Sequence, residues 1–420
     1  MSLHRGSPNR RSRHAEVSVN PLFARPSMES IPKNRLARRP VDPDVAYQIV
    51  HDELLLDGNA RTNLATFVTT WMEPQGSRLM AECADKNLID KDEYPRTAEL
   101  ERRCVNILAD LWGAEPGKAV GCSTTGSSEA CMLGGLALER RWRKRRGSGE
   151  RPSERPNLVM GVNVQVCWEK FCNYWDVEPR CVPMEGDRFH LTAERAVELC
   201  DENTIGVVAI LGSTFDGSYE PVKEIADALD DLQEQKGLDI PIHVDAASGG
   251  MIAPFLDPNV VWDFRIPRVA SINVSGHKFG LVYPGVGWAV WRDEEALPDE
   301  LVFRVNYLGG EMPTFTLNFS RPGSQVAAQY YNFVRLGFEG YRAVQQECRD
   351  VAQQLANDIG ECDALETLTD GRELPAFAFK LADGDHGFDV FDISIRLREG
   401  SWIVPAYTFP RNREDLAVLR

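Results

Sequence analysis

A lysine and an aspartate each follow an apolar stretch of the sequence, where they could meet around one ligand. Lys278 lies in the segment Ser275–Gly280 (SGHKFG), directly after the β-branched stretch 269–274. Asp245 follows the apolar stretch 240–244. Groups at the carboxyl ends of neighbouring strands meet in the crevice of an open α/β sheet. This pair suits pyridoxal phosphate (PLP), because the amine forms a Schiff base with its aldehyde and the carboxylate keeps its pyridine nitrogen protonated.

Each of these residues also has a simpler interpretation. Lys278 by itself is typical of a solvated loop lysine, and Asp245 by itself of a turn or helix-capping residue. Another alternative takes His243 and Asp245 as metal ligands of a hydrolase. The seven histidines are spread along the chain, with no further one at ligand spacing, so the sequence indicates no metal site.

A second candidate site is the segment Thr124–Glu129 (TTGSSE), which runs without a break into a helical pattern over 128–145. This pattern is rich in strong helix formers and ends in basic residues, which suit the dipole of a helix C-terminus. Free N–H groups at a helix N-terminus can hold an anion. Ser127 and Ser128 are therefore candidates for a phosphate site, with ordinary helix capping as the alternative.

The elements that must position these residues alternate between strand-like and helical patterns. Short apolar runs at 157–161 and 205–211 are typical of buried strands. An amphipathic helix is predicted over 221–235, and three more strands over 240–291. This alternation predicts βαβ units, and hence an α/β fold with a mostly parallel sheet.

The last part of the chain has a different organisation. A long helix is predicted over 324–359, interrupted around Gly337 and Gly340 and joining two domains. A strand–helix–strand unit follows, with its strands at 375–381 and 402–404 and its helix at 391–397.

Composition limits the class of protein. A chain of 420 residues suits a large domain plus a smaller one, and 43% hydrophobic with 26% charged residues is ordinary for a globular protein. A net charge of -16 argues against nucleic acid as a partner. The ten cysteines show no C-x-x-C pair, which indicates a reduced, cytoplasmic protein. No apolar run is long enough for a membrane span.

The N-terminal region differs from the rest. The first forty residues contain nine Lys or Arg against two Glu, with no hydrophobic signal-peptide core. We interpret 1–41 as a flexible basic arm, although a transit peptide shares this composition. The remaining domain predictions are an N-terminal segment and large PLP-binding domain over 42–335, and a small C-terminal domain over 336–420.

Several long stretches resemble one enzyme family. They are Asp57–Phe67, Gly126–Gly135 and the segments around Asp245 and Lys278. Through them the chain resembles the PLP-dependent group II decarboxylases of fold type I, and among these the glutamate decarboxylases, from about Asp52 to its last residue. The resemblance implies a large domain with a seven-stranded, mostly parallel sheet and a smaller C-terminal α/β domain. It also implies decarboxylation of L-glutamate to 4-aminobutanoate (GABA) and CO2.

The resemblance further implies roles for single residues, with Lys278 and Asp245 as the catalytic pair. The cofactor-binding residues that it implies are Ser127, Ser128, Gln165, Thr214, Asp245, Ser275, His277, Lys278 and Ser320. The substrate-binding residues that it implies are Thr66, Phe67, Asn87, Asp90 and Arg420. Ser320 would reach the phosphate in the neighbouring subunit, and Asp90 would serve only if protonated, because a carboxylate repels the distal carboxylate of glutamate.

The assembly and the end of the chain complete these expectations. The family implies a homodimer with a shared active site, or a hexamer. The chain stops at Arg420, within an apparent strand, so we expect the small domain to be incomplete. The alternatives are a PLP-dependent decarboxylase of another amino acid, or a catalytically weak, truncated member that acts as a partner subunit.

Overall fold

The computed structural model describes residues 33–64, 68–147, 155–305 and 312–420. The chain divides into two compact units, Met1–Asn59 and Ala60–Arg420. The described part of the first unit contains one helix, α1 (Pro43–Leu54), in which no residue is buried. Asp42 caps this helix by accepting a hydrogen bond from the N–H of Asp44 at 2.9 Å.

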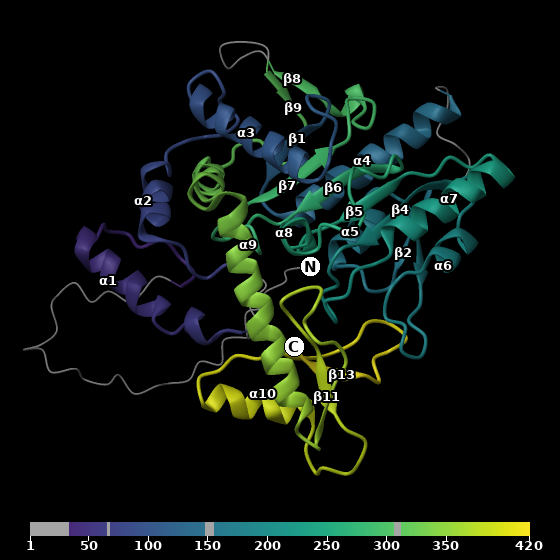
Figure 1. Ribbon diagram of the computed structural model, residues 1–420. Coiled ribbons are helices and arrows are strands. Elements are labelled where there is room, and N and C mark those ends of the chain that lie inside the picture. Colours follow the sequence, from purple (N-terminus) through teal and green to yellow (C-terminus); the bar gives the residue numbers. More distant parts are fainter. Residues whose placement is uncertain (1–32, 65–67, 148–154, 306–311) are drawn as a thin grey trace, which may run out of the picture. The chain divides into compact units, whose positions relative to one another are not determined.

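The second unit is built around a seven-stranded sheet (Figure 1). Its strands are β1 (Val120–Thr124), β2 (Asn157–Gly161), β3 (Glu178–Val182), β4 (Thr204–Ile210), β5 (Ile242–Asp245), β6 (Val269–Val274) and β7 (Gly287–Trp291). They lie in the order β1-β7-β6-β5-β4-β2-β3, in which β7 runs antiparallel to both β1 and β6 and all other neighbours are parallel. The predicted α/β fold with a mostly parallel, seven-stranded sheet is confirmed.

Helices cover both faces of this sheet, which explains why every residue of its central strands β4, β5 and β6 is buried. They are α2 (Pro74–Glu82), α3 (Pro95–Leu111), α4 (Ser127–Arg146), α5 (Val166–Tyr174), α6 (Ala193–Glu198), α7 (Val222–Lys236), α8 (Ala253–Leu256) and α9 (Ser324–Gly360). Along β4, Val207 and Ala209 pack into one core with α3 and α7, whereas Val208 and Ile210 pack into another with α4 and α5. No helix in these described ranges combines the length and apolar character needed to cross a bilayer.

Short elements link or flank these helices and strands. Three are 3-10 helices, η1 (Ala60–Thr62), η2 (Gly249–Met251) and η3 (Asp299–Leu301). A hairpin of β8 (Phe303–Val305) and β9 (Met312–Thr314) follows η3.

Helix α9 leads from the large sheet to a second, four-stranded antiparallel sheet (Figure 1). The elements of this region are β10 (Leu365–Thr367), β11 (Phe379–Leu381), α10 (Val390–Glu399), β12 (Ala406–Thr408) and β13 (Ala417–Leu419). The predicted interruption of α9 lies at Gly337, where φ is 57°, a left-handed value that suits glycine. Gly340 remains helical.

One predicted strand is wrong. At 402–404 the chain has no strand, and the strand of this region is β12, which begins at Ala406. The reason is local: the N–H of Trp402 bonds to the carbonyl of Leu397 at 3.0 Å and thereby closes the end of α10. Ile403 makes only an isolated bridge with Asn63.

Candidate active site

Lys278 lies in the turn that follows β6, with its side chain turned toward the end of β5. Its N–H bonds to the carbonyl of Ser275 at 3.2 Å, and its Nζ donates to Ser248 Oγ at 3.2 Å. Burial lowers the pKa of Lys278, and the charge of Arg420 lowers it further, whereas Asp245 raises it. The amine can therefore lose its proton more easily than an exposed lysine, as a nucleophilic lysine requires.

Asp245 ends β5, the strand that lies beside β6 in the sheet, and four donors hold its carboxylate. Oδ1 accepts from Asn273 Nδ2 at 3.0 Å and from the N–H of Ala247 at 3.2 Å. Oδ2 accepts from Trp168 Nε1 at 2.9 Å and from the Cys131 thiol at 3.5 Å. The side chain is only 5% exposed, so these bonds fix a buried carboxylate next to the lysine.

The start of α4 lies against the lysine turn. Ser127 Oγ is 2.6 Å from Ser275 Oγ, which joins the first turn of the helix to the segment that carries Lys278. Ser128 is exposed beside it. Free N–H groups at the N-terminus of this 20-residue helix and two serine hydroxyls make a cradle suited to a phosphate.

His277 lies between this cradle and the lysine. A Cβ atom added at Gly126 would lie 3.1 Å from His277 Cε1, so the imidazole is close to the helix start. Burial lowers the pKa of His277, and the neighbouring charge of Lys278 lowers it further. Its buried Nδ1 has no hydrogen-bond partner in the described part of the chain, which leaves one polar atom for a ligand to satisfy.

Gln165 and Thr214 lie in the loops that follow β2 and β4. Gln165 immediately precedes α5, and its carbonyl accepts from the N–H of Trp168 at 3.0 Å. Gln165 is thus the residue that precedes a helix and is not part of a strand. Thr214 lies in the turn after β4, where its carbonyl accepts from Tyr407 Oη at 3.5 Å. Since β4 is parallel to β5, this turn lies at the same edge of the sheet as Asp245.

Arg420 immediately follows β13, and its charge acts on the lysine. Its charge lowers the pKa of Lys278, while burial lowers the pKa of Arg420 itself, against the opposing influence of Tyr407 and Asp216. The small sheet is thus followed by a cation whose charge acts on Lys278.

A separate group contains Ser320, Asn87 and Asp90. Asn87 Nδ2 donates to Ser320 Oγ at 3.4 Å, and Asp90 Oδ1 accepts from the N–H of Glu93 at 3.3 Å, as in a capped turn. No hydrogen bond or ion pair joins this group to Lys278 or Asp245 within the described ranges. The two other predicted substrate residues, Thr66 and Phe67, lie outside the described residues.

Two buried ionic side chains tie the Ser320 segment to the large sheet. Glu129, in the first turn of α4, accepts from the N–H groups of Leu317 and Asn318 at 3.0 and 3.3 Å. Arg321 donates to Ser123 Oγ at 2.7 Å and to Glu101 Oε1 at 3.3 Å. The segment is therefore held firmly although most of its own side chains are exposed.

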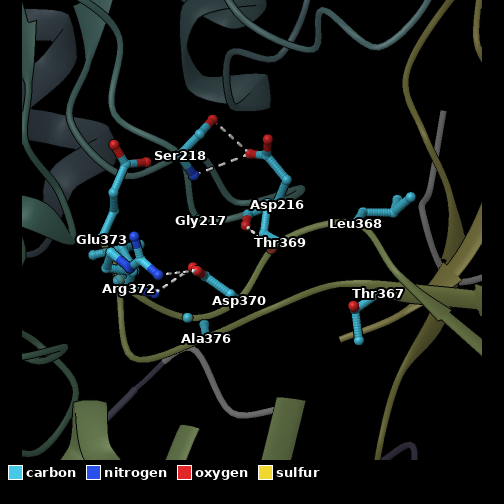
Figure 2. A pocket seen from close by; sticks show the side chains of 12 residues that line it. Asp216, Gly217, Ser218, Thr367, Leu368, Thr369, Asp370, Arg372, Glu373 and Ala376 are labelled. Carbon is cyan, nitrogen blue, oxygen red and sulfur yellow. Dashed lines mark hydrogen bonds and ion pairs between the residues drawn. The ribbon is translucent and has the colours of Figure 1, made fainter. Parts of the chain in front are cut away.

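A cavity of about 460 Å³ has a lining that does not include Lys278 (Figure 2). It is lined by 216–218 from the turn after β4 and by residues of 367–376. Its wall contains an ion pair between Arg372 and Asp370 at 3.1 Å. None of the predicted site residues lines this cavity.

A group of potential metal-ligand atoms also occurs at Asp245. Cys131, Cys167 and Asp245 place such atoms within 4.8 Å of one another. His243 takes no part, because its ring nitrogens lie 2.7 Å from Ser271 Oγ and from Asn273 Oδ1. The alternative of a metal shared by His243 and Asp245 therefore does not match the geometry.

Comparison with known proteins decides the family. Residues 36–382 match the model of the pyridoxal-dependent decarboxylase conserved domain. The chain belongs to the pyridoxal-dependent decarboxylase family. Its cofactor is accordingly PLP, and the residues present fit it: an amine with a lowered pKa, a buried carboxylate, a phosphate cradle and an imidazole with an open nitrogen.

Relatives within this decarboxylase family are similar over most of the chain. A glutamate decarboxylase of Aliivibrio fischeri is 57% identical over 394 residues, which cover 93% of this chain and 85% of that protein. Glutamate decarboxylase 5 of Arabidopsis thaliana is 51% identical, over 93% of this chain and 79% of that protein. The solved structure of a Lactobacillus brevis glutamate decarboxylase matches with a TM-score of 0.90 and 46% identity, over 93% and 90% of the two chains.

A more distant structure supports the fold alone. A sphingosine-1-phosphate lyase of Burkholderia pseudomallei matches with a TM-score of 0.78 at 19% identity, over 94% of this chain and 88% of that one. Decarboxylases and lyases of this fold thus share the large sheet and the arrangement of its helices.

Proposed function

We propose that this chain decarboxylates L-glutamate to GABA and CO2, with PLP bound at Lys278. The observation that carries the proposal is the identity of 57% over 93% of the chain to a protein named glutamate decarboxylase, together with Lys278 and Asp245 at one edge of the sheet. The reaction class is that of a carbon–carbon lyase.

Lys278 and Asp245 have the central roles in this proposal. When bound, PLP accepts the electron pair that remains when the substrate carboxylate leaves as CO2. Lys278 Nζ holds the cofactor, and its lowered pKa favours the neutral amine that this bond requires. Asp245, fixed by its four donors, pairs with the pyridine nitrogen.

The remaining cofactor contacts come from the loops around this pair. Ser127 and Ser128 hold the phosphate at the start of α4, with Ser275 beside them. His277, Gln165 and Thr214 would contact the ring of the cofactor. The open Nδ1 of His277 supports its part in this arrangement.

Substrate recognition is proposed for five residues from separate parts of the sequence. Arg420 binds the α-carboxylate, a role supported by its electrostatic influence on Lys278. Thr66, Phe67, Asn87 and Asp90 bind the distal carboxylate.

We further propose that the enzyme is a homodimer with shared active sites, alone or within a hexamer. Asn87 lies 3.4 Å from Ser320, so these two predicted residues form one group, apart from the pair of Lys278 and Asp245. A group that serves the neighbouring subunit would have this arrangement. The domain divisions at 41 and 335 are part of the same proposal.

A cytoplasmic location is also proposed. All ten cysteines lie in the described part of the chain and are free thiols, which suits a reducing compartment.

The test is release of CO2 from a panel of carboxyl-labelled amino acids by the purified holoenzyme. We expect release from L-glutamate and none with Lys278→Ala. The matched control is Lys223→Ala, which removes an exposed lysine of α7 that pairs with Asp227 and should retain full activity. Faster release from another amino acid would contradict the substrate, and no release from any would contradict the function.

A further inference from the structure

A ladder of four polar side chains lies inside the large sheet, around Asp245. Strands β5 and β6 pair in parallel, with His243 opposite Ser271 and Asp245 opposite Asn273. Side chains two residues apart on a strand share a face, so all four project to the same side. His243 and Asn273 are 0% exposed, which is unusual for polar residues at the centre of an apolar sheet.

The donor and the acceptor of each hydrogen bond in this ladder can be assigned. Asn273 uses its Nδ2 to donate to Asp245 Oδ1 at 3.0 Å, so its Oδ1 is the acceptor for His243 Nε2 at 2.7 Å. Burial lowers the pKa of His243 and favours the neutral ring, which carries one N–H. Its Nδ1 must then accept from the hydroxyl of Ser271 at 2.7 Å.

The imidazole ring of His243 is closely packed by its neighbours. Helix α4 crosses over it at Gly134, where an added Cβ atom would lie only 2.5 Å from His243 Cε1. The Trp168 ring packs edge-on against it, with 5.1 Å between the ring centroids, and donates to the other oxygen of Asp245. The ring therefore has one position, from which it fixes the Asn273 amide.

We propose that His243 is a positioning residue, which acts through Asn273 to hold the Asp245 carboxylate toward the pyridine nitrogen of the cofactor. Without the donor at His243 Nε2, the Asn273 amide can rotate and present its oxygen to the carboxylate, which would repel it. This inference rests on the proposed function of the site, in which Asp245 pairs with that nitrogen.

The experiment observes the nitrogen directly. Holoenzyme is prepared with PLP labelled with ¹⁵N in the ring, and solid-state NMR measures the ring-nitrogen shift while a titration measures the PLP dissociation constant. For His243→Phe we expect the signal to move toward that of the unprotonated ring. The dissociation constant should rise about tenfold, the equivalent of one buried hydrogen bond. His243→Gln keeps a donor for Asn273, so its ring-nitrogen shift and its PLP dissociation constant should both be close to those of wild type.

A matched control separates positioning from general stability. Thr204 Oγ1 donates to Asn157 Oδ1 at 2.8 Å across β4 and β2, another buried polar pair of the same sheet. Thr204→Val should destabilise the fold and leave the nitrogen signal unchanged. A wild-type signal and affinity in His243→Phe, or an equal shift in Thr204→Val, would overturn the inference.

Two further variants keep the outcome decisive. If His243→Phe fails to fold, Ser271→Ala removes only the far end of the ladder. It should shift the signal in the same direction by a smaller amount, and no shift would reject the inference. Asp245→Asn tests the underlying function, because an unchanged signal in that variant would reject the role of Asp245 itself. A shift of the signal in Asp245→Asn without one in His243→Phe would reject only the positioning role of His243.

Discussion

Replacement of Glu220 by Gln should make the stability of the protein less sensitive to rising pH. The Glu220 carboxyl is 3% exposed and accepts from the N–H groups of Ile210 and Leu191 at 2.6 and 2.9 Å and from Asn163 Nδ2 at 3.0 Å. Burial outweighs these three donors and raises the pKa of Glu220 from 4.5 to about 7.

The sign and size of the effect follow from this pKa. The folded protein binds the Glu220 proton more tightly than the unfolded chain does. The resulting stabilisation is complete below pH 4.5 and is lost as pH rises through about 7. At 1.36 kcal/mol for each unit of pKa, the rise of the Glu220 pKa from 4.5 to about 7 corresponds to about 3 kcal/mol of folding stability. Gln is neutral throughout, so the variant lacks this loss.

The assay is urea unfolding of wild type and Glu220→Gln, followed by tryptophan fluorescence between about pH 4.5 and about pH 8. The free energy of unfolding of wild type minus that of the variant should fall by about 3 kcal/mol across this range. A constant offset would reflect the changed hydrogen bonds of Gln and does not affect the slope. A difference that is independent of pH, or that grows as pH rises, would refute the reasoning.

Three further predictions concern the site. Asp245→Asn should lower kcat about a hundredfold or more while PLP content falls less, because an amide cannot stabilise the ring cation by a charge-assisted bond. Steady-state kinetics measure kcat, and absorption spectra measure the PLP content. Gly134→Ala should destabilise the fold by about 1–3 kcal/mol through its clash with His243. The control is Gly360→Ala, whose added Cβ meets nothing closer than 3.8 Å and should leave the stability unchanged. Thermal unfolding of both variants measures the difference. Asp90→Ala should raise KM for glutamate more than it lowers kcat, because it removes a contact proposed for the distal carboxylate, and unchanged kinetics would remove Asp90 from the site.

The strands that lead to the proposed catalytic pair could be predicted because their signals are local. The apolar stretches before Asp245 and Lys278 are β5 and β6, and the apolar run at 157–161 is β2 with the same bounds. The helix predicted over 128–145 is α4, which begins and ends one residue beyond it. Periodicity and composition alone determine these features.

Contacts between distant elements could not be predicted in the same way. Trp168 and Cys131 reach Asp245 from helices α5 and α4, and no pattern in the sequence indicates which face of a helix lies over which strand end. A weaker signal existed for the ladder, because His243 and Asn273 are polar residues within apolar strands. Such residues need partners when buried.

The error at 402–404 has a similar origin. Trp402, Ile403 and Val404 have strong strand propensity, but the turn that ends α10 uses Trp402 for its closing hydrogen bond. The tertiary arrangement then begins the strand only after Pro405, a residue that cannot donate to a sheet.

The central claim is that PLP is bound covalently at Lys278, and borohydride reduction followed by peptide mapping tests it most directly. Purified holoenzyme is reduced, digested and analysed by mass spectrometry, with Lys278→Ala as the control. The account predicts a reduced pyridoxyl group on the peptide that contains Lys278, and none in the variant. A label on another lysine, or an unlabelled Lys278 in protein that has been saturated with PLP, would contradict it.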